Sequence, residues 1–193
     1  VKAISVGDTH ACALTNAGEV RCWGDGVPGY LTGYAVRKPV TIPGLSSDVR
    51  AVDAGKNSTC VLLKTGAVTC WGEVTKEKYF PVDVPGLGDV AEIAVGFHDA
   101  CARTTAGGVK CWGSGEENVP GLYPNLPVDI DGLTSGVLAI DVTGEAFCAV
   151  TADNVYCWGN VIYGGGPGWR FTPAVVTGLP PNVKAINVGV ENL

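Results

Sequence analysis

Hydrophobic and polar residues alternate in short runs along the whole chain, and glycine, proline or asparagine interrupts each run. Alternation with a period of two residues and many β-branched side chains predicts half-buried strands. Residues 1–7, 12–15 and 20–23 form such runs, and a tight turn at 16–18 joins the second to the third. The segment 39–45 begins with proline, which fits an edge strand or the first residue of a strand. Four short strands are therefore expected within the first 48 residues.

The same order of strands recurs along the chain. Four stretches share the pattern of a cysteine, nine or so residues, and Cys-Trp-Gly, namely HACALTNAGEVRCWG, STCVLLKTGAVTCWG, DACARTTAGGVKCWG and AFCAVTADNVYCWG. Their tryptophans, at positions 23, 71, 112 and 158, are 48, 41 and 46 residues apart. We divide the chain into repeats 1–48, 49–89, 90–136 and 137–182, with the start of a fifth at 183–193.

Four antiparallel strands in every unit of about 45 residues predict one blade of a β-propeller. A stacked β-solenoid usually has a shorter period, and an immunoglobulin-like sandwich does not repeat internally at this length. The expected fold is all-β, with four four-stranded blades and the first strand of a fifth. The fifth repeat stops before its cysteine and the chain holds no methionine. We therefore expect either further blades in a longer chain or several chains that complete a ring or a filament.

The eight cysteines form four pairs in phase with the repeat, at Cys12/Cys22, Cys60/Cys70, Cys101/Cys111 and Cys148/Cys157. Folding the first hairpin about Ala17 puts Cys12 opposite Cys22, and the shorter fourth turn still puts Cys148 opposite Cys157. Opposed residues of an antiparallel pair lie about 5 Å apart, within the reach of a disulfide. The alternatives are zinc ligation, which usually needs Cys-x-x-Cys spacing that is missing here, and buried free thiols.

Composition and charge exclude several classes of function. The formal net charge is −6, and no basic footprint exists for nucleic acid or for an anionic membrane surface. No apolar stretch approaches the roughly 20 residues of a spanning helix, so direct membrane insertion is not expected. No set of nucleophile, base and acid recurs, and we predict no catalytic, cofactor or metal site. Oxidised cysteine pairs would place the chain outside the cytoplasm, as a secreted, periplasmic or cell-surface protein.

The stretch VGDTHACALTNAGEVRCWG at residues 6–24 resembles the regulator of chromosome condensation repeat. The resemblance implies a seven-bladed propeller of four-stranded blades and extends over the whole chain. The family's histidine occurs here only as His10, and Thr143 replaces the lead-in glycine of the fourth copy. In its predicted disulfide pairs and its acidic charge, the chain is more similar to the secreted bacterial branch of the family than to the nuclear members. That branch uses the propeller to bind proteins.

The stretches after each Trp-Gly differ between copies, and a propeller would gather them on one rim. They hold Tyr, Trp, Phe and Arg side chains, which are typical of binding hot spots. The predicted partner-binding residues are Tyr30, Tyr34, Tyr79, Phe80, Tyr123, Tyr163, Trp169, Arg170 and Phe171. We interpret the four Trp-Gly tryptophans as blade-packing residues and His10 as a hydrogen-bonded turn histidine.

Two functions follow as hypotheses. The first is a non-enzymatic, extracytoplasmic scaffold that binds a protein partner, or further copies of itself, through these loops. The second is a carbohydrate-binding or enzymatic propeller with its site at the central channel. In the second case the aromatic side chains of the rim would only cover the blade ends.

Overall fold

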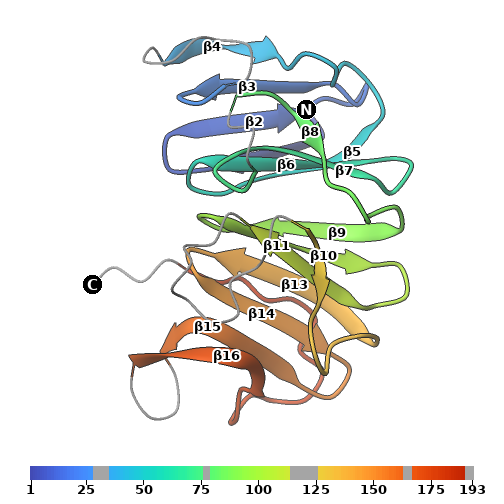
Figure 1. The fold of residues 1–193 in the computed structure, drawn as a ribbon, viewed down its shortest axis with the longest axis vertical. Coiled ribbons are helices and arrows are strands. Elements are labelled where there is room, and N and C mark those ends of the chain that lie inside the picture. Colours follow the sequence, from blue (N-terminus) through green and yellow to red (C-terminus); the bar gives the residue numbers. More distant parts are fainter. Residues whose placement is uncertain (28–34, 76–78, 114–125, 163–166, 190–193) are drawn as a thin grey trace.

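The computed structural model describes residues 1–27, 35–75, 79–113, 126–162 and 167–189, except for the side chains of residues 162 and 167–169. These residues form four separate sheets of four antiparallel strands, each in chain order, which we call blades 1 to 4. The blades are stacked in sequence, from the blue end of the ribbon to the orange end (Figure 1). The described residues contain no helix that is long and apolar enough to cross a membrane.

The strands of each blade follow the predicted repeat. Blade 1 contains β1 (Ala3–Val6), β2 (His10–Leu14), β3 (Val20–Gly24) and β4 (Val36–Thr41). Blade 2 contains β5 (Val49–Ala54), β6 (Ser58–Leu63), β7 (Val68–Gly72) and β8 (Val82–Asp83). Blade 3 contains β9 (Val90–Val95), β10 (Asp99–Thr104), β11 (Val109–Gly113) and β12 (Val128–Asp129). Blade 4 contains β13 (Val137–Thr143), β14 (Ala146–Thr151), β15 (Val155–Ile162) and β16 (Pro167–Val175).

The central hairpin of each blade has the register that the cysteine spacing predicts. In blade 1, Cys12 faces Cys22 and Leu14 faces Val20. In blade 4, Cys148 faces Cys157 even though the turn is one residue shorter. The turn of the first hairpin contains Gly18 at a φ of 87°, a backbone conformation that glycine adopts without steric cost.

All eight cysteines are paired within their own hairpins, as the sequence predicts. The four bridges are Cys12–Cys22, Cys60–Cys70, Cys101–Cys111 and Cys148–Cys157, with S–S distances between 2.04 and 2.12 Å. Each bridge crosses from the second to the third strand of one blade. The described residues include every cysteine of the chain and contain no free thiol, so the alternatives of zinc ligation and buried thiols do not fit the structure.

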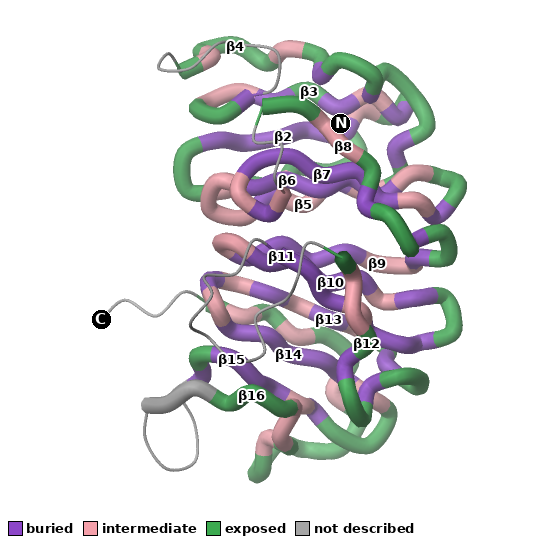
Figure 2. Tube along the Cα trace, viewed as in Figure 1, coloured by how far each residue is buried: buried purple, intermediate pink, exposed green. Residues whose placement is uncertain are grey.

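Neighbouring blades pack face to face through unlike faces. The Cys12–Cys22 face of blade 1 lies against Trp71 of blade 2 in one apolar cluster. The Cys60–Cys70 face of blade 2 contacts Trp112 of blade 3 in the same way, and the Cys101–Cys111 face of blade 3 contacts Trp158 of blade 4. We call these surfaces the disulfide face and the Trp face of a blade. Burial is concentrated on the strands inside the stack (Figure 2).

The tryptophans confirm this packing role, with one difference. Trp71 and Trp112 are each 1% exposed and Trp158 is 2% exposed. Trp23 is only half-buried, because no blade in the described structure covers the Trp face of blade 1. Ile4 and Val6, on the same face of blade 1 as Trp23, are likewise 59% and 70% exposed. Their counterparts in blade 2, Val52 and Ala54, are each 8% exposed.

Glycine follows each of these tryptophans for a steric reason. The glycine that follows each tryptophan lies where the third strand passes close to the turn between the first and second strands. A Cβ atom on Gly72 would lie 2.1 Å from the carbonyl oxygen of Asn57. Glycine at this place therefore allows a contact between two backbones that any side chain would prevent.

Strand direction decides where the loops lie. The first strand of each blade leads to the turn before its second strand, and the third strand returns to the same end of the sheet. The four variable stretches after Trp-Gly begin at this end, which we call the upper end. The hairpin turns between second and third strands, and the connections to the next blade, lie at the opposite, lower end.

Candidate functional site

The upper end carries the described part of the predicted partner-binding set. Tyr79 and Phe80 are 51% and 60% exposed and directly precede the outer strand β8. Arg170 is also exposed, and Phe171 is 49% exposed on β16. The structure thus brings these residues together as two pairs, on blades 2 and 4, with blade 3 between them. Tyr30, Tyr34, Tyr123 and Tyr163 lie outside the described residues, as does the side chain of Trp169.

The predicted disulfide residues lie away from these pairs, in the interior of the stack. Each of the eight is at most 6% exposed, and each sulfur is bonded within its own hairpin. Cys111, for example, is fully buried between its partner Cys101 and the apolar residues at the interface with blade 4. The cysteines therefore support the scaffold and supply no reactive group to the upper end.

A cavity of about 230 Å³ opens at the upper end between blades 1 and 2. Its lining includes Thr9, His10, Asp25, Asn57, Glu73 and Tyr79. Glu73 is held by His98 of blade 3, with 3.3 Å between the carboxylate oxygen and Nδ1. The cavity thus combines these polar groups with two aromatic side chains, those of Trp71 and Tyr79.

His10 connects blade 1 to blade 2 at the floor of this cavity. Its Nε2 lies 2.6 Å from the hydroxyl of Thr59, which is fully buried. Burial lowers the pKa of His10, against a smaller opposing effect from Asp8. The imidazole is therefore neutral at pH 7 and acts as an interblade hydrogen-bonding group, as the interpretation of His10 as a bonded turn residue predicted.

The residues that replace His10 in the next two copies behave differently from one another. Ser58 accepts a hydrogen bond from the backbone N–H of Val74 at 2.9 Å and donates to the carbonyl oxygen of Phe97 at 3.3 Å. Asp99 is 1% exposed, and its Oδ1 has no hydrogen-bond partner among the described residues. Burial, and then the nearby charge of Glu145, raise the pKa of Asp99 to about 7.

The carboxylates of the first strands serve the contacts between blades. The first strands of neighbouring blades contact one another. Asp53 accepts hydrogen bonds from the Ser5 hydroxyl at 2.9 Å and from the backbone N–H of Val95 in blade 3 at 2.8 Å. Asp141 accepts in the same way from the backbone N–H of Val188. Burial raises the pKa of both carboxyls, and Asp141 adds to the effect on Asp53 by its charge.

These bonds tie each first strand to the unit that follows it. The Asp53 and Asp141 side chains are committed to backbone groups of the next unit. Among the described residues, no three His, Cys, Asp or Glu side chains are grouped so that they could hold a metal ion. Asp53 and Asp141 therefore connect one unit of the stack to the next.

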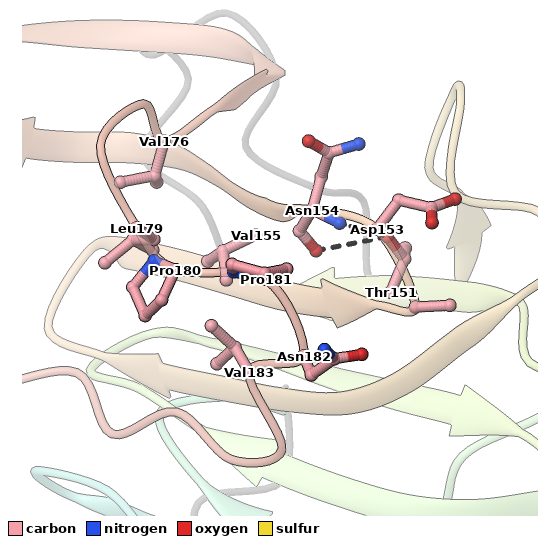
Figure 3. Close-up of a pocket in the computed structure, with 11 residues that line it drawn as sticks. Thr151, Asp153, Asn154, Val155, Val176, Leu179, Pro180, Pro181, Asn182 and Val183 are labelled. Carbon is pink, nitrogen blue, oxygen red and sulfur yellow. Dashed lines mark hydrogen bonds between the residues drawn. The ribbon is translucent and has the colours of Figure 1, made fainter.

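A second cavity, of about 190 Å³, lies at the lower end of blade 4 between the β14–β15 turn and residues 176–183 (Figure 3). In blade 3 the equivalent hairpin turn is bonded to the first strand of the next blade, since the N–H of Val137 donates to the Gly107 carbonyl at 2.9 Å. The fourth turn is one residue shorter, and no such bond joins Val183 to it in the described chain. Leu179 is 49% exposed, whereas its counterpart Leu133, which packs in the apolar cluster between blades 3 and 4, is 1% exposed.

The sheet topology and the unlike-face packing define the chain as a series of β-propeller blades. Residues 1–27 and 49–73 match the Regulator of chromosome condensation (RCC1) repeat. No curated protein sequence matches the chain significantly. The sequence comparison and the four meander sheets thus agree on an RCC1-type propeller fold.

Solved structures show the same fold at low sequence identity. Human WBSCR16 is 23% identical with a TM-score of 0.78, and the match covers 94% of this chain and 54% of that one. Prp20p from Saccharomyces cerevisiae is 24% identical with a TM-score of 0.73, covering 94% and 51%. The CRINKLY WD40 ectodomain of the Arabidopsis thaliana receptor kinase ACR4 is 24% identical with a TM-score of 0.53, covering 83% and 51%. The chain spans about half the length of each.

Asp99 and Thr59 were not among the residues predicted from the sequence. The other copies have alanine or phenylalanine at the position of Thr59. The hydrogen bond between His10 and Thr59 is therefore specific to the contact between blades 1 and 2. Asp99 occupies the position of His10 and Ser58 in the first two copies. A carboxylate at a position where the other copies have a neutral or small side chain is the sequence feature that could have identified it. Its burial depends on blade 4, which the alignment of repeats does not reveal.

Proposed function

We propose that this chain is a non-enzymatic, extracytoplasmic propeller scaffold whose upper end binds a protein partner. The observation that carries the proposal is the contrast between the two ends of its repeats. The stretches that differ most between copies all begin at the upper end, and Tyr79 and Phe80 are exposed there. Variable loops on a repeated scaffold are the usual place of binding residues.

A protein partner suits the chemistry of the upper end. Tyr, Phe and Arg side chains supply large contact areas that bury well against another protein. One of the similar structures is yeast RCC1 (Prp20) with Kap60 bound, and another is described with its binding to Gsp1p and histones. Those partners belong to those proteins; for this chain they support binding to protein as the general mode.

The four cysteine pairs support a location outside the cytoplasm. Disulfides persist in secreted, periplasmic and surface proteins, whereas cytosolic thiols are kept reduced. By chain entropy, closing a loop of about 11 residues stabilises the folded state by roughly 3 kcal/mol per bridge. A reduced chain would lose this stabilisation in all four blades.

The binding test uses two double variants and one control. Tyr79→Ala with Phe80→Ala removes the blade 2 pair, and Arg170→Ala with Phe171→Ala removes the blade 4 pair. Leu138→Ala removes a side chain that is 55% exposed near the lower end of blade 4. Tagged protein is incubated with the secreted and periplasmic proteins of its source, and captured proteins are identified by mass spectrometry and purified for affinity measurements.

We expect at least one upper-end variant to bind the purified partner about tenfold or more weakly, as loss of a hot-spot residue does. The Leu138→Ala variant should bind like the parent. Equal affinity for all three variants would refute the upper end as the binding surface. Alkylation of the chain in intact cells, before and after reduction, tests the location, because eight reactive thiols before reduction would contradict it.

A further inference from the structure

The residue after each Trp-Gly pair lies at the upper end, against the turn that precedes the second strand of its blade. In blade 1 the N–H of Asp25 donates to the Thr9 carbonyl at 3.0 Å, and in blade 2 the N–H of Glu73 donates to the Asn57 carbonyl at 3.2 Å. Asp25 and Glu73 thus occupy equivalent positions and both carry a carboxylate. The interface between blades 1 and 2 can therefore be compared directly with the one between blades 2 and 3.

Between blades 2 and 3, this carboxylate has a basic group beside it. An oxygen of Glu73 lies 3.3 Å from Nδ1 of His98, the residue immediately before β10 of the next blade. The equivalent residue, immediately before β6 of blade 2, is Asn57. Where Glu73 meets an imidazole, Asp25 therefore has only an uncharged amide at the corresponding position of the next blade.

No cation of the described residues balances the carboxylate of Asp25. None of the ion pairs in the described part of the chain includes it. Lys56, the neighbour of Asn57 in sequence, has its Nζ 4.7 Å from the centre of the Phe97 ring in blade 3. Neither lysine nor arginine is among the described residues that line the cavity between blades 1 and 2. Asp25 and Glu73 both line this cavity, but only Glu73 has a basic partner.

The other groups of the cavity suit one planar cation. The Oδ1 of Asn57 accepts a hydrogen bond from the Thr9 hydroxyl at 3.4 Å, and an amide oxygen has a second lone pair to offer. Tyr79 is 51% exposed, and a cation binds favourably over an aromatic ring. At the floor, His10 is neutral because burial lowers its pKa, and its Nδ1 has no hydrogen-bond partner among the described residues.

The size of the cavity limits what it can hold. Its volume of about 230 Å³ is below the roughly 300–1,000 Å³ of pockets that enclose drug-sized ligands. A single long side chain of another protein fits this space better than a chain of sugars does. The net charge of −6 also favours association with a basic partner.

We propose that this cavity receives an arginine side chain of the protein partner. The inference rests on the proposed function and specifies which chemistry of the partner the upper end recognises. The guanidinium donates to the carboxylate of Asp25 and to Oδ1 of Asn57, and one of its faces lies against the Tyr79 ring. The arginine thereby supplies between blades 1 and 2 the basic group that His98 supplies between blades 2 and 3. Lysine has the charge but neither the flat surface nor the paired donors.

The first experiment titrates short peptides into the full 193-residue chain, labelled with ¹⁵N. The probe is a peptide with one arginine between two glycines, blocked at both ends, and the amide signals of Gly26 and Gly72, which line the cavity, report binding. In two control peptides, citrulline keeps the shape without the charge, and lysine keeps the charge without the planar group. We expect saturable binding of the arginine peptide at about millimolar concentrations, binding of the lysine peptide about threefold weaker, and none of the citrulline peptide.

Two matched variants test the assignment to Asp25. Asp25→Asn removes the charge and keeps the size of the side chain, and it should raise the dissociation constant of the arginine peptide about threefold, as loss of an exposed ion pair does. Asp131→Asn removes the same charge from an exposed residue at the lower end and should bind like the parent. Circular dichroism and the absence of reactive thiols show that each variant is folded. A parent that binds no arginine peptide, a citrulline or lysine peptide that binds equally well, or an unchanged Asp25→Asn variant overturns the proposal.

Affinity for the purified partner separates this inference from the proposed function. If binding weakens in the variant that lacks Arg170 and Phe171 but not in Asp25→Asn, the upper end binds protein and the arginine site is refuted. If Asp25→Asn also weakens binding, while Asp131→Asn does not, both are supported. A chain that binds the arginine peptide at the cavity but captures no protein refutes the proposed function and retains the cavity as a guanidinium site.

Discussion

Replacing Asp99 by asparagine should change how stability depends on pH. The carboxyl is 1% exposed between blades 3 and 4, and its Oδ1 has no hydrogen-bond partner in the described part of the chain. Asparagine keeps the size and shape of the side chain but does not titrate. The variant therefore removes the proton equilibrium and leaves the packing against Gly113 and blade 4 in place.

The magnitude follows from the difference in pKa between the two states. The pKa of Asp99 is about 7 in the folded protein, against an ordinary value of 3.8. Between these values the folded state holds a proton that the unfolded state has released, so stability falls as pH rises and becomes constant above about pH 7. A difference of about three pKa units corresponds to roughly 4 kcal/mol, of which about 3 kcal/mol falls between pH 5 and pH 8.

The assay is chemical denaturation of both proteins under non-reducing conditions at several values between pH 5 and pH 8, monitored by tryptophan fluorescence. The variant should become more stable relative to the parent as pH rises, by about 3 kcal/mol over this range. Asp53 and Asp141, whose pKa values are also raised, occur in both proteins. Their contributions therefore cancel in the difference.

A second substitution tests the cause. Glu145→Gln removes the neighbouring charge, which is the smaller of the two effects that raise the pKa of Asp99. The pH-dependent difference should then shrink but remain, since burial is the larger cause. Parent and Asp99→Asn curves that stay parallel between pH 5 and pH 8 would refute the reasoning.

Two further predictions concern the blade architecture. Replacing both Cys60 and Cys70 by alanine opens one bridge that spans ten positions in sequence, and the free energy of unfolding should fall by roughly 3 kcal/mol in urea titrations; an unchanged midpoint would contradict the bridge. Trp112→Ala should cost about 3–5 kcal/mol, as large deletions in cores do, whereas Trp23→Ala should cost clearly less because Trp23 is half-buried. Equal losses in thermal unfolding would show that the two faces are packed alike.

The fold could be predicted from the sequence in large part because the information is local and repeated. The register of Cys12 with Cys22, and of Cys101 with Cys111, follows from the position of the turn, and the structure confirms both. The packing of Trp112 follows from its place in every copy. The difference at Trp23 does not, since it depends on what lies next to blade 1 in space and not on the repeat itself.

The candidate site could be predicted less well, for a physical reason. Variable loops are recognised by their differences, but the contacts of an individual loop residue depend on a neighbouring blade. Asp99 shows this most clearly, because its raised pKa arises from blade 4 and from Glu145 across the interface. The nine predicted partner-binding residues remain a prediction, with the Tyr79 and Phe80 pair as the first to test.

The short reach of the disulfides has a consequence for how such a chain can change over generations. Eight cysteines allow about 105 different sets of four bridges, yet every bridge here joins cysteines nine or ten residues apart in one hairpin. Oxidation of a blade therefore requires no residue from any other blade. A gene segment that encodes one repeat could be duplicated, deleted or exchanged, and its crosslink would travel with it intact.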